Sequence, residues 1–203
     1  MVCWTTHLKC LPQKRQGYAT VMVGPKIYSF VRNRDINNKD QMEVHVFNTV
    51  SLRWKKLLPP TTGKGESPLK DTPRSFWGHT AVLMEDHMVY IWGGLYTLSR
   101  EYGNVLYVFD VHTHSWFKPK VTGTVPKVRS QHSACALGKV MYLHGGFNTL
   151  TCFDDKIQKL DTTTMVWTLI GGTLPPASAW HFATFIGTKI RGQCIPMLVF
   201  MKL

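Results

Sequence analysis

An internal repeat constrains the fold of this chain more than any other feature of its sequence. A strand-like apolar segment that ends in tryptophan occurs three times, as MEVHVFNTVSLRW, NVLYVFDVHTHSW and DKIQKLDTTTMVW. In each copy an Asn or Asp stands six positions before the tryptophan: Asn48 before Trp54, Asp110 before Trp116, and Asp161 before Trp167. Such regular self-similarity indicates a repeat architecture, in which one small structural unit is copied along the chain.

A second motif lies upstream of the tryptophan and keeps its phase. It consists of His79, Tyr90, Gly93 and Gly94 in the second copy, and of His132, Tyr142, Gly145 and Gly146 in the third. The second glycine lies 22 residues before the tryptophan in one copy and 21 residues before it in the next. The three tryptophans are 62 and 51 residues apart. That spacing matches the period of about 50 residues in kelch repeats, each of which forms a four-stranded blade of a β-propeller.

The recurring residue types suit such a blade. A glycine pair after a strand lets the chain bend close to a neighbouring backbone, where a Cβ would clash or where φ is positive. The segment 105–109 is apolar at every position, as expected for a strand that is covered on both faces. An Asp-x-x-Thr turn follows, and its side-chain oxygens are expected to bond local amides. Each tryptophan then opens the fourth strand and fills the space between blades.

We therefore predict an all-β fold, a partial kelch β-propeller of about three four-stranded antiparallel blades with an incomplete fourth. The blades are expected near residues 16–58, 78–120 and 131–170, and the incomplete blade near 178–187. Residues 1–187 would form this partial propeller. Residues 188–203 would form a divergent tail, because neither a Tyr nor a glycine pair follows Lys189. Since a propeller avoids exposed edges by closing its ring, the chain is not expected to be a stable closed monomer.

The repeats, with stretches such as HSACALGKVMYLHGG and KLDTTTMVWTLI, resemble kelch-repeat proteins that are substrate receptors of cullin-RING ubiquitin ligases. The resemblance implies a protein-interaction module that binds a C-terminal degron of its target. It also implies an elongin/cullin adaptor as a second partner. The box that binds this adaptor follows the propeller in such proteins, and the present sequence is expected to lack it.

The same resemblance suggests residues that contact the partner. In such proteins an arginine three positions before the repeat histidine helps to hold the degron carboxylate, which suits bidentate guanidinium chemistry. Arg15 and Arg129 match this offset, and the other two repeats lack the arginine. Trp77 and Trp180 lie close to the positions that lack it. These four residues are the candidate partner-binding set.

No cofactor, metal site or enzymatic activity is predicted. His112 and His114 are the tightest pair among nine histidines, and no third ligand has useful spacing. His79, His132 and His181 open their blades and are expected to form structural hydrogen bonds. The sequence contains no GxSxG, Walker loop or GxGxxG motif. The five cysteines have irregular spacings, which favour free thiols over a disulfide framework or a metal knuckle.

Charge leaves an alternative function open. Lys and Arg number 24 against 12 Asp and Glu, which gives a net charge of +12. Basic residues gather in the region 55–74 and in the region 118–129, so association with chromatin or nucleic acid is the alternative, although no base-reading motif accompanies them. A non-functional truncated product is a further alternative. Because no apolar run approaches the length of a membrane span, we expect a soluble protein of the cytoplasm or nucleus.

Overall fold

The computed structural model describes residues 17–32, 41–57, 71–148, 152–153, 156–170, 182–186, 189–193 and 198–202. Within these ranges the chain forms β-strands, turns and irregular connections, and no helix. The expected all-β class is therefore confirmed. Among the described residues there is no helix that is long and apolar enough to cross a membrane.

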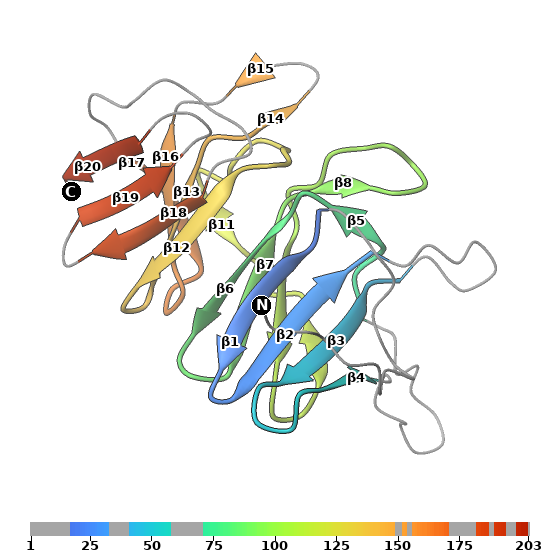
Figure 1. Cartoon of the computed structure of the whole chain (residues 1–203). Helices are drawn as coiled ribbons and strands as arrows, with labels where there is room; N and C mark the ends of the chain where they lie inside the picture. Colours follow the sequence, from blue (N-terminus) through green and yellow to red (C-terminus); the bar gives the residue numbers. More distant parts are fainter. Residues whose placement is uncertain are drawn as a thin grey trace.

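Three sheets correspond to the three complete repeats, and each contains four consecutive antiparallel strands (Figure 1). Blade 1 consists of β1 (Ala19–Val23), β2 (Lys26–Val31), β3 (Glu43–Asn48) and β4 (Arg53–Leu57). Blade 2 consists of β6 (Thr80–Met84), β7 (Met88–Trp92), β9 (Leu106–Asp110) and β10 (Ser115–Phe117). Blade 3 consists of β12 (Ser133–Leu137), β13 (Val140–His144), β16 (Ile157–Asp161) and β17 (Val166–Ile170). In blade 3 a fifth strand, β11 (Thr122–Gly123), pairs parallel with β17.

The fourth sheet differs from the single strand that we expected. β18 (Phe182–Ile186) pairs antiparallel with β19 (Lys189–Gln193), and β19 pairs antiparallel with β20 (Leu198–Lys202). Residues 189–193 and 198–202 of the expected tail thus supply two strands to the incomplete blade. The repeat motif does not mark these strands, because backbone pairing can satisfy the open edge of β18 without a Tyr or a glycine pair.

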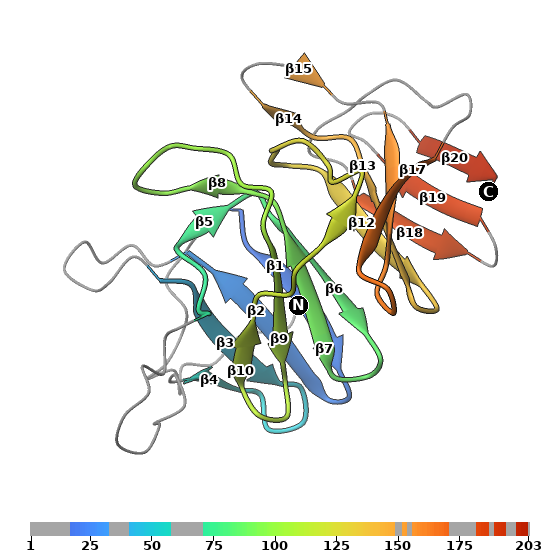
Figure 2. The ribbon, with the colours of Figure 1, turned by 180° about the vertical axis from the view of Figure 1, so that it is seen from behind.

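The blades stack through their flat faces and bury two apolar cores. β6 lies next to β1 on one side and β12 on the other, and β18 lies next to β12 (Figures 1 and 2). Between blades 1 and 2, the ring of Phe30 meets those of Phe109 and Trp116 at centroid distances of 5.5 and 5.8 Å. Between blades 2 and 3, Trp92 meets Trp167 at 5.9 Å. Two of the three repeat tryptophans therefore fill the space between blades, whereas Trp54 packs on Phe47 of its own blade.

The predicted polar turn is present in all three blades. A side-chain Oδ1 atom accepts hydrogen bonds from two backbone amides in each case: from Val50 and Ser51 to Asn48, from His112 and Thr113 to Asp110, and from Thr163 and Thr164 to Asp161. The residue just before the fourth strand has a φ of 53 to 58° at Leu52, His114 and Met165. The turn is thus specified by local chemistry that the sequence repeats.

The glycine pairs and the repeat tyrosines also lie where the repeat predicts. All four glycines have a positive φ, between 69 and 102°. A Cβ on Gly93 would approach the ring of His132 to 2.5 Å, and one on Gly94 would approach Phe76 to 2.9 Å. Tyr90 is buried in β7 and Tyr142 is half-buried in β13. The glycines are therefore required by close contact as well as by backbone conformation.

Candidate functional site

The two ends of the blades differ in their connections. Short hairpin turns close one end, which we call the turn end. At the opposite end, which we call the loop end, β5 (Phe76–Trp77) pairs with β8 (Leu95–Tyr96), and β14 (Phe147–Asn148) pairs with β15 (Cys152–Phe153) (Figures 1 and 2). Because loops held on a rigid β scaffold are where binding residues concentrate, the loop end is the candidate functional site.

Backbone hydrogen bonds join neighbouring blades at the loop end. The amide of Gly78 donates to the carbonyl of Gly17 at 3.0 Å, and the amide of Gln131 donates to the carbonyl of Gly78 at 2.6 Å. These three residues have φ of 70, 71 and 58°, so Gln131 adopts the left-handed conformation that glycine adopts in the other two blades. Within the described residues, the buried Oε1 of Gln131 has no hydrogen-bond partner. Backbone strain and an unpaired polar atom therefore coincide at this position.

Of the two members of the candidate partner-binding set that the structure describes, Trp77 is partly exposed at the loop end and Arg129 is buried. Trp77 lies against blade 1, because a Cβ on Gly17 would come within 3.1 Å of the Trp77 Cβ. Arg15 and Trp180 lie outside the described residues. Trp77 is thus available to a partner while its base is fixed by packing.

Arg129 does not face the surface, which corrects the expectation from its sequence offset. Its side chain is buried, with 1% of the residue exposed. Nη1 donates to the Gly145 carbonyl at 3.1 Å, Nη2 to Oε1 of Gln158 at 3.2 Å, and Nε to the Lys127 carbonyl at 3.1 Å. The planar donor fork therefore ties the glycine pair of blade 3 to a neighbouring strand, a structural use of the same geometry that would bind a carboxylate.

The blade-opening histidines are buried between blades. Nε2 of His132 lies 2.9 Å from Oγ1 of Thr80 in blade 2, which fits the expected structural hydrogen bond. The ring of His79 packs edge-on against Phe76 at 4.8 Å. Burial lowers the pKa of His79 to about 3, against a smaller opposing effect of the Phe30 backbone. Among the described residues neither ring nitrogen of His79 has a hydrogen-bond partner, so the structural hydrogen bond expected there is not formed. His181 lies outside the described residues.

The buried neutral ring of His79 predicts sensitivity to acid. The unfolded state binds a proton near pH 6.5 and the folded state only near pH 3, so acid favours the unfolded state across this window. His79 should therefore contribute a loss of about 2 kcal/mol in unfolding free energy between pH 7 and pH 5. Urea unfolding at both pH values should show a smaller loss for His79→Gln than for the wild type. Equal losses in His79→Gln and in the wild type would contradict the prediction.

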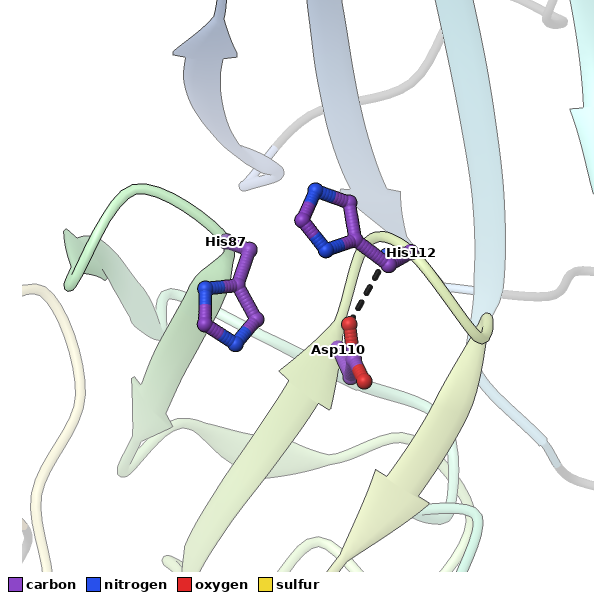
Figure 3. A group of neighbouring side chains, drawn as sticks. All are labelled: His87, Asp110 and His112. Carbon is purple, nitrogen blue, oxygen red and sulfur yellow. Dashed lines mark hydrogen bonds between the residues drawn. The ribbon is translucent and has the colours of Figure 1, made fainter.

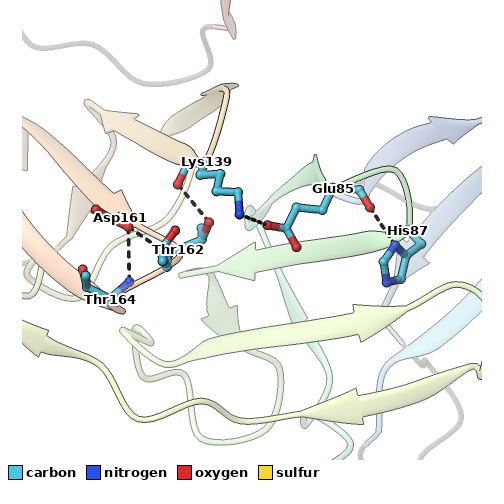
Figure 4. A network of polar contacts seen from close by, with 7 residues as sticks. Glu85, His87, Lys139, Asp161, Thr162 and Thr164 are labelled. Carbon is cyan, nitrogen blue, oxygen red and sulfur yellow. Dashed lines mark hydrogen bonds and ion pairs between the residues drawn. The ribbon is translucent and has the colours of Figure 1, made fainter.

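Other chemically active groups are few in the described part of the chain. Cys135 is a free, buried thiol, and burial raises its pKa to about 12, so it is a poor nucleophile. The exposed Lys139 pairs with Glu85 at 3.4 Å between blades 3 and 2 (Figure 4). Lys118, Lys120 and Lys127 of the second basic region are exposed. Within the same described residues, His87, Asp110 and His112 form a group that could hold a metal ion (Figure 3).

Comparison with known proteins agrees with this architecture. The family model for the Attractin/LZTR1 β-propeller matches residues 4–190. The chain belongs to the Attractin/LZTR1 β-propeller family. Among solved structures, that of YjhT is similar to this chain with a TM-score of 0.68. The match covers 88% of this chain and 58% of that chain, at 15% sequence identity. That likeness supports the propeller fold alone.

Curated relatives place the propeller among kelch-repeat proteins. Kelch domain-containing protein 3 of Homo sapiens is 45% identical over 197 residues, which cover 94% of this chain and 50% of that protein. Host cell factor 2 of Homo sapiens is 28% identical over 216 residues, which cover 88% of this chain and 26% of that protein. The chain thus spans about half the length of the Kelch domain-containing protein 3 relatives it matches. It is a kelch-type propeller, a class of protein-interaction module.

Proposed function

We propose that this kelch-type propeller recognises protein substrates for a cullin-RING ubiquitin ligase, in the cytoplasm or nucleus, by binding their C-terminal residues at the loop end. The observation that carries the proposal is the 45% identity to Kelch domain-containing protein 3 over 94% of the chain. In this proposal the elongin/cullin adaptor is the second partner, bound through a box outside the propeller. Recognition of a short peptide end is a task for loops on a rigid scaffold.

The chemistry of the loop end supports a peptide partner. Trp77 offers an amphipathic aromatic surface that is held in place at its base, and such side chains dominate the binding energy of many protein interfaces. Arg74 is exposed just before β5 and carries the charge that a terminal carboxylate requires. Because Arg129 is buried in structural bonds, we do not include it among the carboxylate-binding groups.

Peptide binding tests the proposal directly. The purified chain is exposed to an array of peptides that display varied C-terminal residues with a free carboxylate, and to the same peptides with an amidated end. We expect selective binding that amidation weakens at least about tenfold, because the amide removes the charge. Trp77→Ala should weaken binding by a similar factor, since buried aromatic anchors typically contribute about 2 kcal/mol or more. Phe117→Ala, which removes an exposed aromatic ring from the outer strand β10, is the matched control and should bind as the wild type does.

A pull-down from cell extract at moderate salt distinguishes protein partners of a ubiquitin ligase from nucleic acid, the alternative class of partner. Recovery of elongin and cullin subunits would support the ligase assignment. Recovery that disappears with nuclease or with added salt would overturn it in favour of nucleic-acid association through the exposed lysines, because phosphate contacts weaken steeply as salt rises. Equal binding of free and amidated peptides would overturn recognition of the C-terminal carboxylate.

A further inference from the structure

Two histidines and an aspartate meet at the turn end of blade 2. One potential ligand atom from each of His87, Asp110 and His112 lies within 4.8 Å of the other two. The two imidazole rings are parallel, with centroids 4.8 Å apart, and Figure 3 shows the Asp110 carboxylate beside them. His87 is half-buried and His112 is exposed, so solvent and small ions can reach the group. This cluster lies outside the loop end and has no part in the proposed function.

The backbone holds the three residues together. His87 precedes β7, Asp110 ends β9, and Met88 at the start of β7 pairs with Asp110. The amide of Val111 donates to the His87 carbonyl at 3.0 Å, and the amide of His112 donates to Oδ1 of Asp110 at 2.8 Å. The side chains are therefore brought together by sheet register and turn geometry rather than by contacts between flexible loops.

One imidazole is fixed in the tautomer that a metal ligand needs. Nδ1 of His87 lies 2.6 Å from the Glu85 carbonyl oxygen (Figure 4). A carbonyl oxygen can only accept, so Nδ1 carries the proton, and in the neutral ring Nε2 has a free lone pair. Histidines that bind metals in proteins almost always donate their other ring N–H in this way.

The other blades show that the fold does not need these histidines. The equivalent positions carry Pro25, Asn48 and Val50 in blade 1, and Lys139, Asp161 and Thr163 in blade 3. The same backbone bond forms there, from Thr49 to the Pro25 carbonyl and from Thr162 to the Lys139 carbonyl, each at 2.9 Å. Among the three blades, only blade 2 combines two imidazoles with a carboxylate, and backbone structure does not explain that combination.

We propose that His87, Asp110 and His112 bind a divalent transition-metal ion of the Zn²⁺ class, with water completing the coordination. Imidazole nitrogen and carboxylate oxygen are ligands that Zn²⁺ takes at about 2.0–2.2 Å. Such distances require ligand atoms roughly 3.3 Å apart in a tetrahedral site. The ligand atoms lie within 4.8 Å of one another, so the side chains would move closer together when the ion binds. The exposed ring of His112 is free to rotate toward the other two ligands, and Asp110 retains acceptor capacity beyond its bonds in the turn. The ion would clamp the β6–β7 turn to the β9–β10 turn.

Zinc titration of the metal-stripped full chain tests this site, and the repeats supply replacements that preserve the fold. His112→Thr copies Thr163 of blade 3, and Asp110→Asn copies Asn48 of blade 1, where Asn makes the same turn. We expect calorimetry to find a Zn²⁺ site whose affinity each variant lowers at least about tenfold. Loss of a residue that only orients a metal ligand already costs about that much, and loss of a direct ligand should cost at least as much. The control His114→Met copies Met165 of blade 3 and should bind Zn²⁺ as the wild type does.

A second measurement locates the ion. In two-dimensional NMR spectra, added Zn²⁺ should shift the amide signals of residues 85–88 and 110–114 in the wild type and in His114→Met. Absence of saturable binding would overturn the proposal. Binding that persists unchanged in both His112→Thr and Asp110→Asn would also overturn it, because the ion would then occupy another site. Asp110→Asn keeps the test decisive if His112→Thr fails to fold.

Discussion

Replacement of Gly146 by alanine is expected to lower the free energy of unfolding by about 3 kcal/mol or more. A Cβ at this position would lie 2.6 Å from the Ser130 carbonyl oxygen and 2.7 Å from the His132 Cβ. The Ser130 carbonyl cannot move away without cost, because it accepts the Phe147 amide at 3.1 Å and the Ser130 amide donates back at 3.1 Å. The φ of +80° adds the strain of a left-handed alanine, about 1–2 kcal/mol.

Gly138→Ala separates the clash from the backbone strain. Gly138 belongs to the same blade and has a φ of +57°, but a Cβ there would meet no atom within 4 Å. This control should therefore lose only the conformational share, about 1–2 kcal/mol. Urea unfolding monitored by tryptophan fluorescence measures both variants against the wild type. If the two alanine variants lose the same stability, the close approach between the glycine pair and the segment before β12 is not what requires glycine.

Replacement of Trp167 by alanine is expected to cost about 4 kcal/mol. Trp167 is 2% exposed and belongs to the apolar core between blades 2 and 3, where its ring meets that of Trp92 at 5.9 Å. Removing the indole takes away apolar contacts with both blades and leaves a cavity that the paired strands cannot close. The loss should appear in the unfolding free energy and as a lower melting temperature.

The repeat provides a matched control for this tryptophan. Trp54 holds the equivalent position in blade 1, but it is only half-buried and packs on Phe47 of its own blade at 5.1 Å. Trp54→Ala should therefore cost about 1–2 kcal/mol, since less surface is lost and no interior cavity forms. Equal losses for the two variants would show that the repeat position, rather than burial between blades, determines the contribution of the tryptophan.

Features that depend on local chemistry could be predicted from the sequence. The turn built on Asp110 and Asp161 needs only a side-chain oxygen and the backbone amides that follow it. The spacing of these residues in the sequence is therefore enough to predict the turn. The glycine pairs are similar, because φ and close approach both exclude a side chain there. The repetition then indicated the blade, because three copies of one pattern are expected to form the same structural unit and to pack on one another in the same way.

The candidate sites depended on information that spacing does not contain. Arg129 satisfies the offset of a partner-binding arginine, yet burial and three guanidinium bonds make it structural. The sequence pairs His112 with His114, but the His114 ring stacks on Phe109 at 6.3 Å. The partner that the fold gives His112 is His87, which lies in a different hairpin. Separation along the chain gives no measure of such a contact.

The sequence by itself determined the blade: its strands, its polar turn, its glycine pair and the tryptophan that opens its last strand. Each of these depends on residues close together in the chain, so the repeat expresses them directly. Only the tertiary structure decided which side chains face a neighbouring blade, which are left to solvent, and which distant turns meet. The register that pairs Met88 with Asp110 brings His87 and His112 together, and the stacking of blade 2 on blade 3 buries Trp167. Burial and cross-strand register arise from how complete sheets pack, and no local pattern specifies them.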